Sequence, residues 1–174
     1  MSALDRYREL VAKVDAFFAR VEQRHADQML CGSGCFDCCL VRLSVTAVEA
    51  AVIREALAAL SDETRARLSE RAARNEPDRC AALGDDGRCA IYAGRPLVCR
   101  SHGVQIRQRG ARDEVVIDTC FRNFGEHGAR AADPDCVLDQ TTLSTLLLAI
   151  DSAHAAETGG TAGTRIPIAD LLRE

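Results

Sequence analysis

The sequence predicts a mainly helical α+β fold, a single domain over residues 1–174 with a small β-hairpin and a cysteine-rich core. Three observations lead to this prediction. Several segments carry apolar residues at spacings of three and four, a polar turn joins two short strand-like segments, and nine cysteines crowd the middle of the chain. With 174 residues, 47% of them hydrophobic, the chain can bury an apolar core without relying on cross-links.

Helices are predicted where apolar spacing or a capping pattern marks a start. Thr46 and Glu49 match a capping box, in which a hydroxyl and a carboxylate satisfy free amides at a helix N-terminus. Ser61 is expected to cap the next helix in the same way. The predicted helices are Leu4–Met29, Thr46–Leu60, Asp62–Asn75, Gln140–Ala156 and a short one at Ile168–Leu172, the last two making a C-terminal helix and tail over residues 140–174.

The predicted β structure is small and lies in the second half of the chain. Gly103–Ile106 and Glu114–Asp118 are expected to form a hairpin, because a polar, glycine-containing turn separates two apolar runs. Arg88–Tyr92 is expected to be a short strand behind the turn Gly84–Gly87. Cys120–Asp135 shows no regular pattern and is expected to be irregular.

The densest group of cysteines is Cys31-x3-Cys35-x2-Cys38-Cys39, which places four thiols within nine residues. Such spacing lets one loop present several soft donors to one centre, and thiolates suit zinc or an iron–sulfur cluster. The adjacent Cys38 and Cys39 are expected to point in different directions. They would then bind different metals, or one would be a metal ligand while the other lies just outside the ligands.

Further cysteines follow this segment. Cys80, Cys89, Cys99 and Cys120 bring the set of candidate ligands to eight, enough for one or two sites that hold an iron–sulfur cluster, iron or zinc. These thiols define the predicted metal core over residues 30–121. The ninth cysteine, Cys136, is expected to pack as a small apolar side chain.

The cysteine segment and the later run Arg88-Cys89-Ala90-Ile91-Tyr92-Ala93-Gly94-Arg95-Pro96-Leu97-Val98-Cys99-Arg100 together resemble the YkgJ-type cysteine-cluster family. This family is described as a zinc- or iron-chelating domain, and the resemblance covers residues 30–121. A similar segment occurs in flagellin lysine methylases, which are iron–sulfur proteins, but this chain is much shorter and lacks a methylase-like region. The resemblance implies metal binding at Cys31, Cys35, Cys38, Cys39, Cys80, Cys89, Cys99 and Cys120.

Other polar residues near the cysteines could support the metal. Clustered thiolates carry excess negative charge, which the guanidinium groups of Arg95 and Arg100 could balance or reach by hydrogen bonds. His102 follows Cys99 closely, so its imidazole is a candidate extra ligand. His25, late in the first predicted helix, is a weaker candidate beside the first cysteine.

Composition and charge exclude several function classes. A formal net charge of −4 argues against a nucleic-acid partner, which usually requires a basic face. No apolar run reaches the ~20 residues that a membrane-spanning helix needs. The charged first twenty residues do not resemble a signal peptide, so we expect a cytoplasmic protein whose thiols stay reduced. The expected partners are a metal ion and another protein.

Several functions remain compatible with the sequence. The leading interpretation is a metal-binding protein that handles metal or transfers electrons, and the main alternative is a zinc-stabilised protein-interaction module. A radical enzyme would explain the spacing from Cys31 to Cys38, and a thiol redox protein would explain Cys35-x2-Cys38. Both classes are built on alternating strands and helices, and this sequence lacks that pattern. No acid–base pair, nucleophile triad or phosphate loop is apparent, so a non-enzymatic role is favoured.

Overall fold

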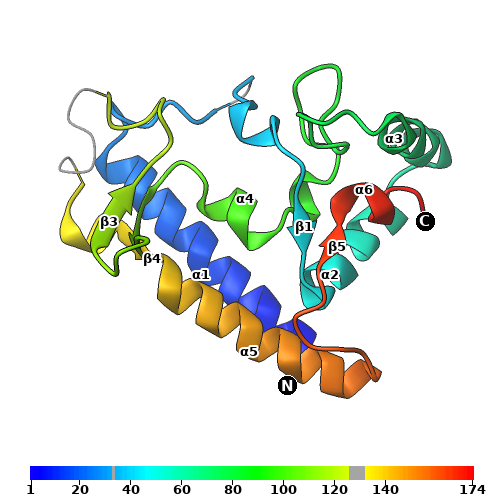
Figure 1. Cartoon of the computed structure of the whole chain (residues 1–174). Coiled ribbons are helices and arrows are strands. Elements are labelled where there is room, and N and C mark those ends of the chain that lie inside the picture. Colours follow the sequence, from blue (N-terminus) through cyan, green and yellow to red (C-terminus); the bar gives the residue numbers. More distant parts are fainter. Residues whose placement is uncertain (33, 126–131) are drawn as a thin grey trace. The chain divides into compact units, whose positions relative to one another are not determined.

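A computed structural model of the chain describes residues 1–32, 34–125 and 132–174, and it confirms the mainly helical α+β class (Figure 1). The chain divides into two compact units, each built from separate stretches of sequence. Unit 1 contains Met1–Tyr7, Ser33–Pro96 and Ile150–Glu174, and unit 2 contains Arg8–Gly32 and Leu97–Ala149. The single-domain organisation stays a prediction.

The helices of unit 1 begin where their capping residues predict. Helix α2 spans Ala47–Ala58, and the capping box of Thr46 and Glu49 is present at its start. Helix α3 spans Asp62–Arg74, where the Ser61 hydroxyl accepts a hydrogen bond from the Thr64 N–H at 3.3 Å. These side chains satisfy amides that have no partner within the helix, so both helix starts could be predicted from the sequence.

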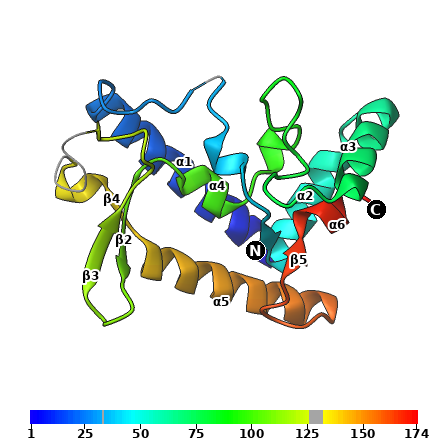
Figure 2. The same ribbon diagram turned by 45° about the horizontal axis from the view of Figure 1, so that its top comes forward.

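A two-stranded sheet in unit 1 joins distant parts of the chain. Strand β1, Ser44–Val45, pairs antiparallel with β5, Ile166–Pro167, which leads directly into helix α6, Ile168–Leu171. Helix α6 contacts both α2 and α3, as both ribbon views show (Figures 1 and 2). The sequence did not predict this sheet, because strands of two residues are too short to show an alternating pattern.

Unit 1 has an apolar core that includes one of the candidate ligands. Cys80 is buried together with Ile53 and Leu68 of the two long helices and Leu171 of α6. The packing therefore fixes the backbone around Cys80 before any metal binds. The buried residues of this core are Val45, Ala50, Ile53, Leu68, Ala72, Cys80, Ala82, Ile91, Ile168, Leu171 and Leu172.

Unit 2 contains most of helix α1, Ala3–Arg24, and the short helix α4, Leu97–Ser101. Its sheet has the strand order β3-β2-β4, with the three strands spanning Val115–Asp118, Gln105–Arg109 and Val137–Asp139. Strands β2 and β3 form the predicted antiparallel hairpin, while β4 runs parallel to β2 and was not predicted. Helix α5, Gln140–Thr158, begins directly after β4 in unit 2 and ends in unit 1.

Two loop predictions have different outcomes. The predicted strand at Arg88–Tyr92 is wrong: Cys89 makes only an isolated bridge with Leu83, and a 3₁₀ turn follows at Tyr92–Gly94. The Ala90 N–H instead donates to the Ala82 carbonyl at 2.9 Å, which holds the segment in a compact loop. In the predicted irregular segment 120–135, the described parts are loops and the start of a 3₁₀ turn, while 126–131 lie outside the described residues.

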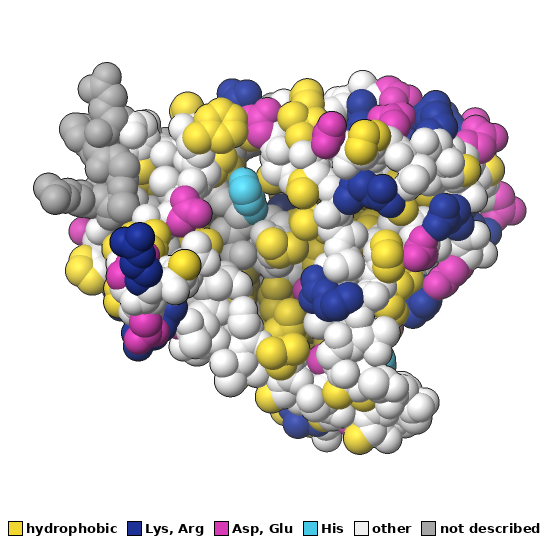
Figure 3. Space-filling view, in the orientation of Figure 1, with side chains coloured by type: hydrophobic (Ala, Val, Ile, Leu, Met, Phe, Trp, Pro, Cys, Tyr) yellow, Lys and Arg dark blue, Asp and Glu magenta, His cyan; other side chains and the backbone are white. Residues whose placement is uncertain are grey.

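Some large apolar side chains of unit 1 remain at the surface near the cysteines. Leu40 and Val41 follow the first cysteine segment directly and are 49% and 42% exposed, and Phe36 is also exposed. Tyr92, close in sequence to Cys89, is exposed as well. Hydrophobic side chains also reach the surface on the face drawn in Figure 3. None of the described helices combines the length and the apolar character that crossing a membrane requires.

Asp151 provides a test of the packing in unit 1. Its carboxylate is fully buried and accepts hydrogen bonds from the Val48 N–H at 3.1 Å and the Gly163 N–H at 2.9 Å. In Asp151→Asn one acceptor becomes an amide donor that faces a backbone N–H, so we expect the free energy of unfolding to fall by about 1–3 kcal/mol. Chemical denaturation measures this change. The exposed Asp78→Asn should stay within about 0.5 kcal/mol of wild type, and equal effects would contradict this account.

Candidate metal centre

All nine cysteines lie in the described residues and all are free thiols. Unit 1 contains Cys35, Cys38, Cys39, Cys80 and Cys89, whereas Cys31, Cys99, Cys120 and Cys136 belong to unit 2. The thiols are buried or half-buried, so they are held within the protein and are still free to act as ligands.

A backbone hydrogen bond joins the two cysteine-bearing segments of unit 1. The first segment forms a 3₁₀ turn at Asp37–Cys39, closed by the Cys39 N–H donating to the Phe36 carbonyl at 2.8 Å. The Cys39 carbonyl in turn accepts from the Cys80 N–H, also at 2.8 Å. Residues forty-one positions apart are thereby fixed side by side, which spacing in the sequence alone could not establish.

The adjacent thiols of Cys38 and Cys39 form a hydrogen-bonded pair. The Cys39 thiol stabilises the Cys38 thiolate and lowers the Cys38 pKa from 9.0 to about 7, against the opposing effect of burial. The same hydrogen bond raises the pKa of Cys39, which keeps its proton. The prediction that these side chains point apart is wrong, because rotation about the Cα–Cβ bonds brings neighbouring sulfurs together even where the backbone directs them differently.

Tight turns surround the sulfurs of Cys80 and Cys89 with backbone N–H groups. Burial raises the pKa of both thiols. Hydrogen bonds from Ala82 and Leu83 oppose this effect at Cys80, and a hydrogen bond from Ile91 opposes it at Cys89. Backbone donors of this kind stabilise the anionic sulfur that a metal requires.

The four thiols of Cys38, Cys39, Cys80 and Cys89 act on one another electrostatically. Negative charge on Cys38, Cys80 and Cys89 raises the pKa of Cys39, in addition to its hydrogen bond and its burial. Arg95 lowers the pKa of Cys38 and Cys89, as a nearby positive charge should. The Arg95 guanidinium also lies 4.1 Å from the centre of the Tyr92 ring, in a cation–π contact that orients it.

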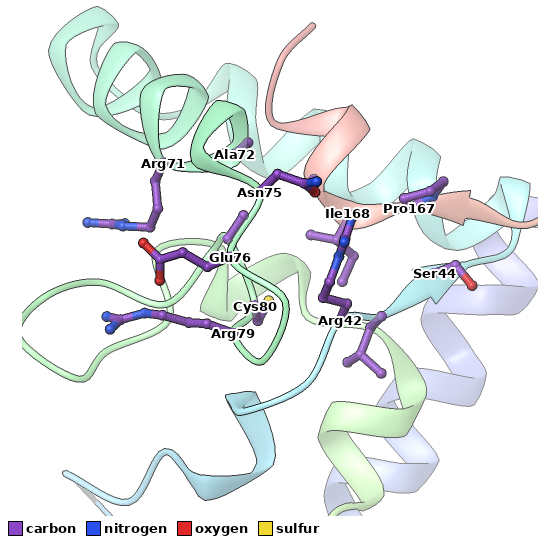
Figure 4. A pocket seen from close by; sticks show the side chains of 13 residues that line it. Arg42, Ser44, Arg71, Ala72, Asn75, Glu76, Arg79, Cys80, Pro167 and Ile168 are labelled. Carbon is purple, nitrogen blue, oxygen red and sulfur yellow. The ribbon is translucent and has the colours of Figure 1, made fainter.

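Cys80 also lines a surface cavity of about 210 Å³ in unit 1 (Figure 4). Arg71 and Arg79 lie on one side of this cavity, and both guanidinium groups are near the Asp85 carboxylate, at 3.2 and 3.7 Å. Asp85 belongs to the turn that precedes Cys89, so these ion pairs help to position that turn. Cys35 lies in the same unit and is half-buried.

In unit 2, Asn123 holds Cys31 in place. Its side-chain amide donates to the Cys31 sulfur at 3.2 Å and to the Gly103 carbonyl at 2.7 Å, and its oxygen accepts from the Leu30 N–H at 2.8 Å. The Asn123 N–H donates to the Cys120 carbonyl at 2.9 Å. A Cβ on residue 103 would lie only 2.6 Å from the Cys31 sulfur, so this position requires glycine. No sequence pattern pointed to Asn123, because it lies in an irregular segment.

Three further predicted residues of unit 2, Cys99, Arg100 and His102, lie in helix α4 or directly after it. Cys99 lies in this helix and is half-buried, whereas Arg100 is nearly buried and forms an ion pair with Asp15 of α1 at 2.6 Å. The structure thus gives Arg100 a carboxylate partner, a contact that the sequence did not predict. His102 is exposed, and partial desolvation lowers its pKa while Asp118 opposes this effect, so the neutral, metal-binding form of the imidazole is favoured.

Together, the fold and the thiols define a mainly helical α+β protein built around a cysteine cluster. Residues 30–120 match the model of the CxxCxxCC family, described as "Putative zinc- or iron-chelating domain". The chain belongs to this family, which confirms the resemblance found in the sequence and supports metal binding by the cysteines. No curated protein and no solved structure matches the chain.

The pKa of Cys38 predicts the reactivity of the metal-free, reduced protein. Because only the thiolate is nucleophilic, alkylation of Cys38 should rise with pH around a midpoint near 7. Cys39→Ala removes the hydrogen bond that stabilises the thiolate, so the midpoint should move up toward 9.0. Peptide mass spectrometry after brief iodoacetamide treatment measures both. An unchanged midpoint in Cys39→Ala would disprove the paired arrangement.

Asn123 should be necessary for the stability of unit 2. Asn123→Ala removes three hydrogen bonds made by a buried side chain, so we expect the free energy of unfolding to fall by about 2–4 kcal/mol. Chemical denaturation of the reduced protein gives the value. Gln140→Ala removes the amide that donates to Ser144 within α5 and should cost about 1 kcal/mol or less. Similar losses in both variants would argue against the role given to Asn123.

Proposed function

We propose that Cys38, Cys39, Cys80 and Cys89 bind an iron–sulfur cluster and that the protein uses it in electron transfer. The observation behind this proposal is that thiols from two separate segments form one electrostatically coupled set. Four cysteines are the usual complement for such a cluster. Metal ions in place of the protons would stabilise the thiolates, whose charge burial and mutual repulsion disfavour at Cys80 and Cys89.

The spacing of the sulfurs favours a cluster over a single zinc ion. Among the described residues, no three of these four sulfurs all lie within 4.8 Å of one another. Zinc–sulfur bonds of about 2.3 Å hold four thiolates roughly 4 Å apart, so a single ion would require the sulfurs to move closer together. A cluster binds its cysteines through different iron atoms, and a wider arrangement of sulfurs suits it better.

The protein's own groups match the needs of an anionic redox centre. A bound cluster supplies the exchange of single electrons. The N–H groups of Ala82, Leu83 and Ile91 stabilise negative sulfur, and Arg95 adds positive charge near Cys38 and Cys89. Hydrogen bonds and charges of this kind adjust the reduction potential of a cluster.

The exposed apolar residues of unit 1 support docking of a protein partner. Leu40 and Val41 continue the first cysteine segment, and Tyr92 adjoins the second. Apolar contacts beside the thiols would suit a partner that exchanges electrons with the centre. The same residues favour the second candidate function, a zinc-stabilised interaction module. The other predicted ligands, Cys31, Cys35, Cys99 and Cys120, are proposed to bind further metal.

Metal content discriminates between the two functions. We expect protein purified without oxygen to be brown and to contain iron with a matching amount of acid-labile sulfide. Cys80→Ser and Cys89→Ser should each lose most of the iron and also lose stability, since metal binding is coupled to folding. Elemental analysis, sulfide assay and visible absorption give the result.

The matched control is Cys136→Ala in unit 2, which should keep its iron and sulfide because Cys136 lies outside the proposed centre. Colourless protein with stoichiometric zinc would refute the cluster and support the interaction module. Undiminished iron in both serine variants would refute the assigned ligands.

A further inference from the structure

A second group of metal-binding side chains lies in unit 2, outside the segment that matches the family. His25 follows the end of α1, while Asp133 and Cys136 flank the start and end of the 3₁₀ turn Pro134–Cys136. Within the described part of the chain, this is the one group of three donors found within 4.8 Å of one another: an imidazole nitrogen, a carboxylate oxygen and the cysteine sulfur.

His25 has an unsatisfied polar atom that faces this group. The residue is only 7% exposed, and its Nε2 atom is buried with no hydrogen-bond partner among the described residues. The nearest carboxylate oxygen, Oδ2 of Asp133, is 3.9 Å away, which is too far for a hydrogen bond. A buried nitrogen without a partner costs free energy, and a metal ion between His25 and Asp133 would remove that cost.

The side chains of this group are already held in position. The edge of the His25 ring packs against Phe124, with ring centres 5.6 Å apart, and its backbone N–H continues the hydrogen bonding of α1 to Val21. Cys136 is fully buried, and its N–H donates to the Asp133 carbonyl at 2.8 Å. Such preorganisation lowers the entropy that metal binding would otherwise have to overcome. Complete burial also makes Cys136 unsuitable as a nucleophile for external substrates.

One positive charge, that of Arg24, lies beside this group. Its guanidinium forms a close ion pair with Asp135 at 2.6 Å and a longer one with Asp133 at 3.7 Å, and it donates a long hydrogen bond to the Cys136 sulfur at 3.9 Å. Arg20 donates to the Asp135 carbonyl at 3.0 Å. Asp135 therefore takes the shorter of the two ion pairs with Arg24, and the side chain of Asp133 is 58% exposed, so it can turn toward an ion that displaces its longer ion pair.

We propose that His25, Asp133 and Cys136 bind a divalent transition metal, for which Zn²⁺ is the best match. Imidazole nitrogen, carboxylate oxygen and thiolate sulfur are all zinc ligands. Three protein ligands leave a fourth position of the tetrahedron open, which a water molecule or a further ligand can occupy. The site gives unit 2 a mixed-ligand centre whose metal can exchange, and it assigns Cys136 a function beyond packing.

Zinc titration of the purified full-length protein, kept reduced and free of oxygen, tests this site. Asp133→Asn is the decisive variant, because its exposed side chain can be replaced without disturbing the core. We expect Asp133→Asn, His25→Gln and Cys136→Ala each to weaken one equivalent of zinc binding by at least roughly 10- to 100-fold, the loss that changes around a metal commonly cause. Calorimetry measures affinity and stoichiometry, and cobalt absorption reports whether sulfur is a ligand.

The matched control is Asp113→Asn, which removes an exposed carboxylate of unit 2 that pairs with Arg109 and lies outside the group, and it should leave zinc affinity within about threefold of wild type. Circular dichroism verifies that each variant is folded. Zinc affinity and stoichiometry unchanged in Asp133→Asn would overturn the proposal, as would an equal loss in Asp113→Asn. Iron and sulfide are measured in the same samples, so that this test is independent of the proposed iron–sulfur cluster. If the cluster proposal fails, the wild-type protein contains no iron; if the zinc proposal fails, the zinc affinity of Asp133→Asn is unchanged.

Discussion

The arrangement of the candidate centre depends on the hydrogen bond from the Cys80 N–H to the Cys39 carbonyl. This bond joins the end of the first cysteine segment to the start of the second, and both segments rest on the apolar core of unit 1. Because Cys80 is itself part of that core, the backbone near its sulfur is fixed by packing. The thiols are therefore gathered by ordinary folding forces, and a metal would add to an arrangement that already exists.

Gathering thiols in a partly buried place has an electrostatic consequence. Burial raises the pKa values of Cys80 and Cys89, and neighbouring thiolates raise them further. The hydrogen bond between Cys38 and Cys39 raises the pKa of Cys39, together with burial and repulsion, and lowers the pKa of Cys38. Without metal, the set favours one thiolate and keeps the other sulfurs protonated. A cation reverses this balance, and the backbone N–H groups and Arg95 already favour the charged form.

Different groups contact the cysteine sulfurs in the two units. In unit 1, backbone amides and neighbouring thiols surround the sulfurs. In unit 2, the Asn123 side chain fixes Cys31, and a histidine and a carboxylate accompany Cys136. All-sulfur sets suit both zinc and iron–sulfur clusters, whereas mixed sets of nitrogen, oxygen and sulfur suit zinc and similar ions. The two places therefore differ in the range of metals that their donors can accept.

The sequence by itself determined the helices, the hairpin and the family, because capping side chains, apolar spacing and cysteine motifs are local patterns. It could not determine the β1–β5 pairing, the contact between Cys38 and Cys39 or the position of Asn123. Nor could it bring His25 to Cys136, since neither residue belongs to a motif. These contacts join residues distant in the chain or depend on side-chain rotation, and only the packing of the folded chain decides them.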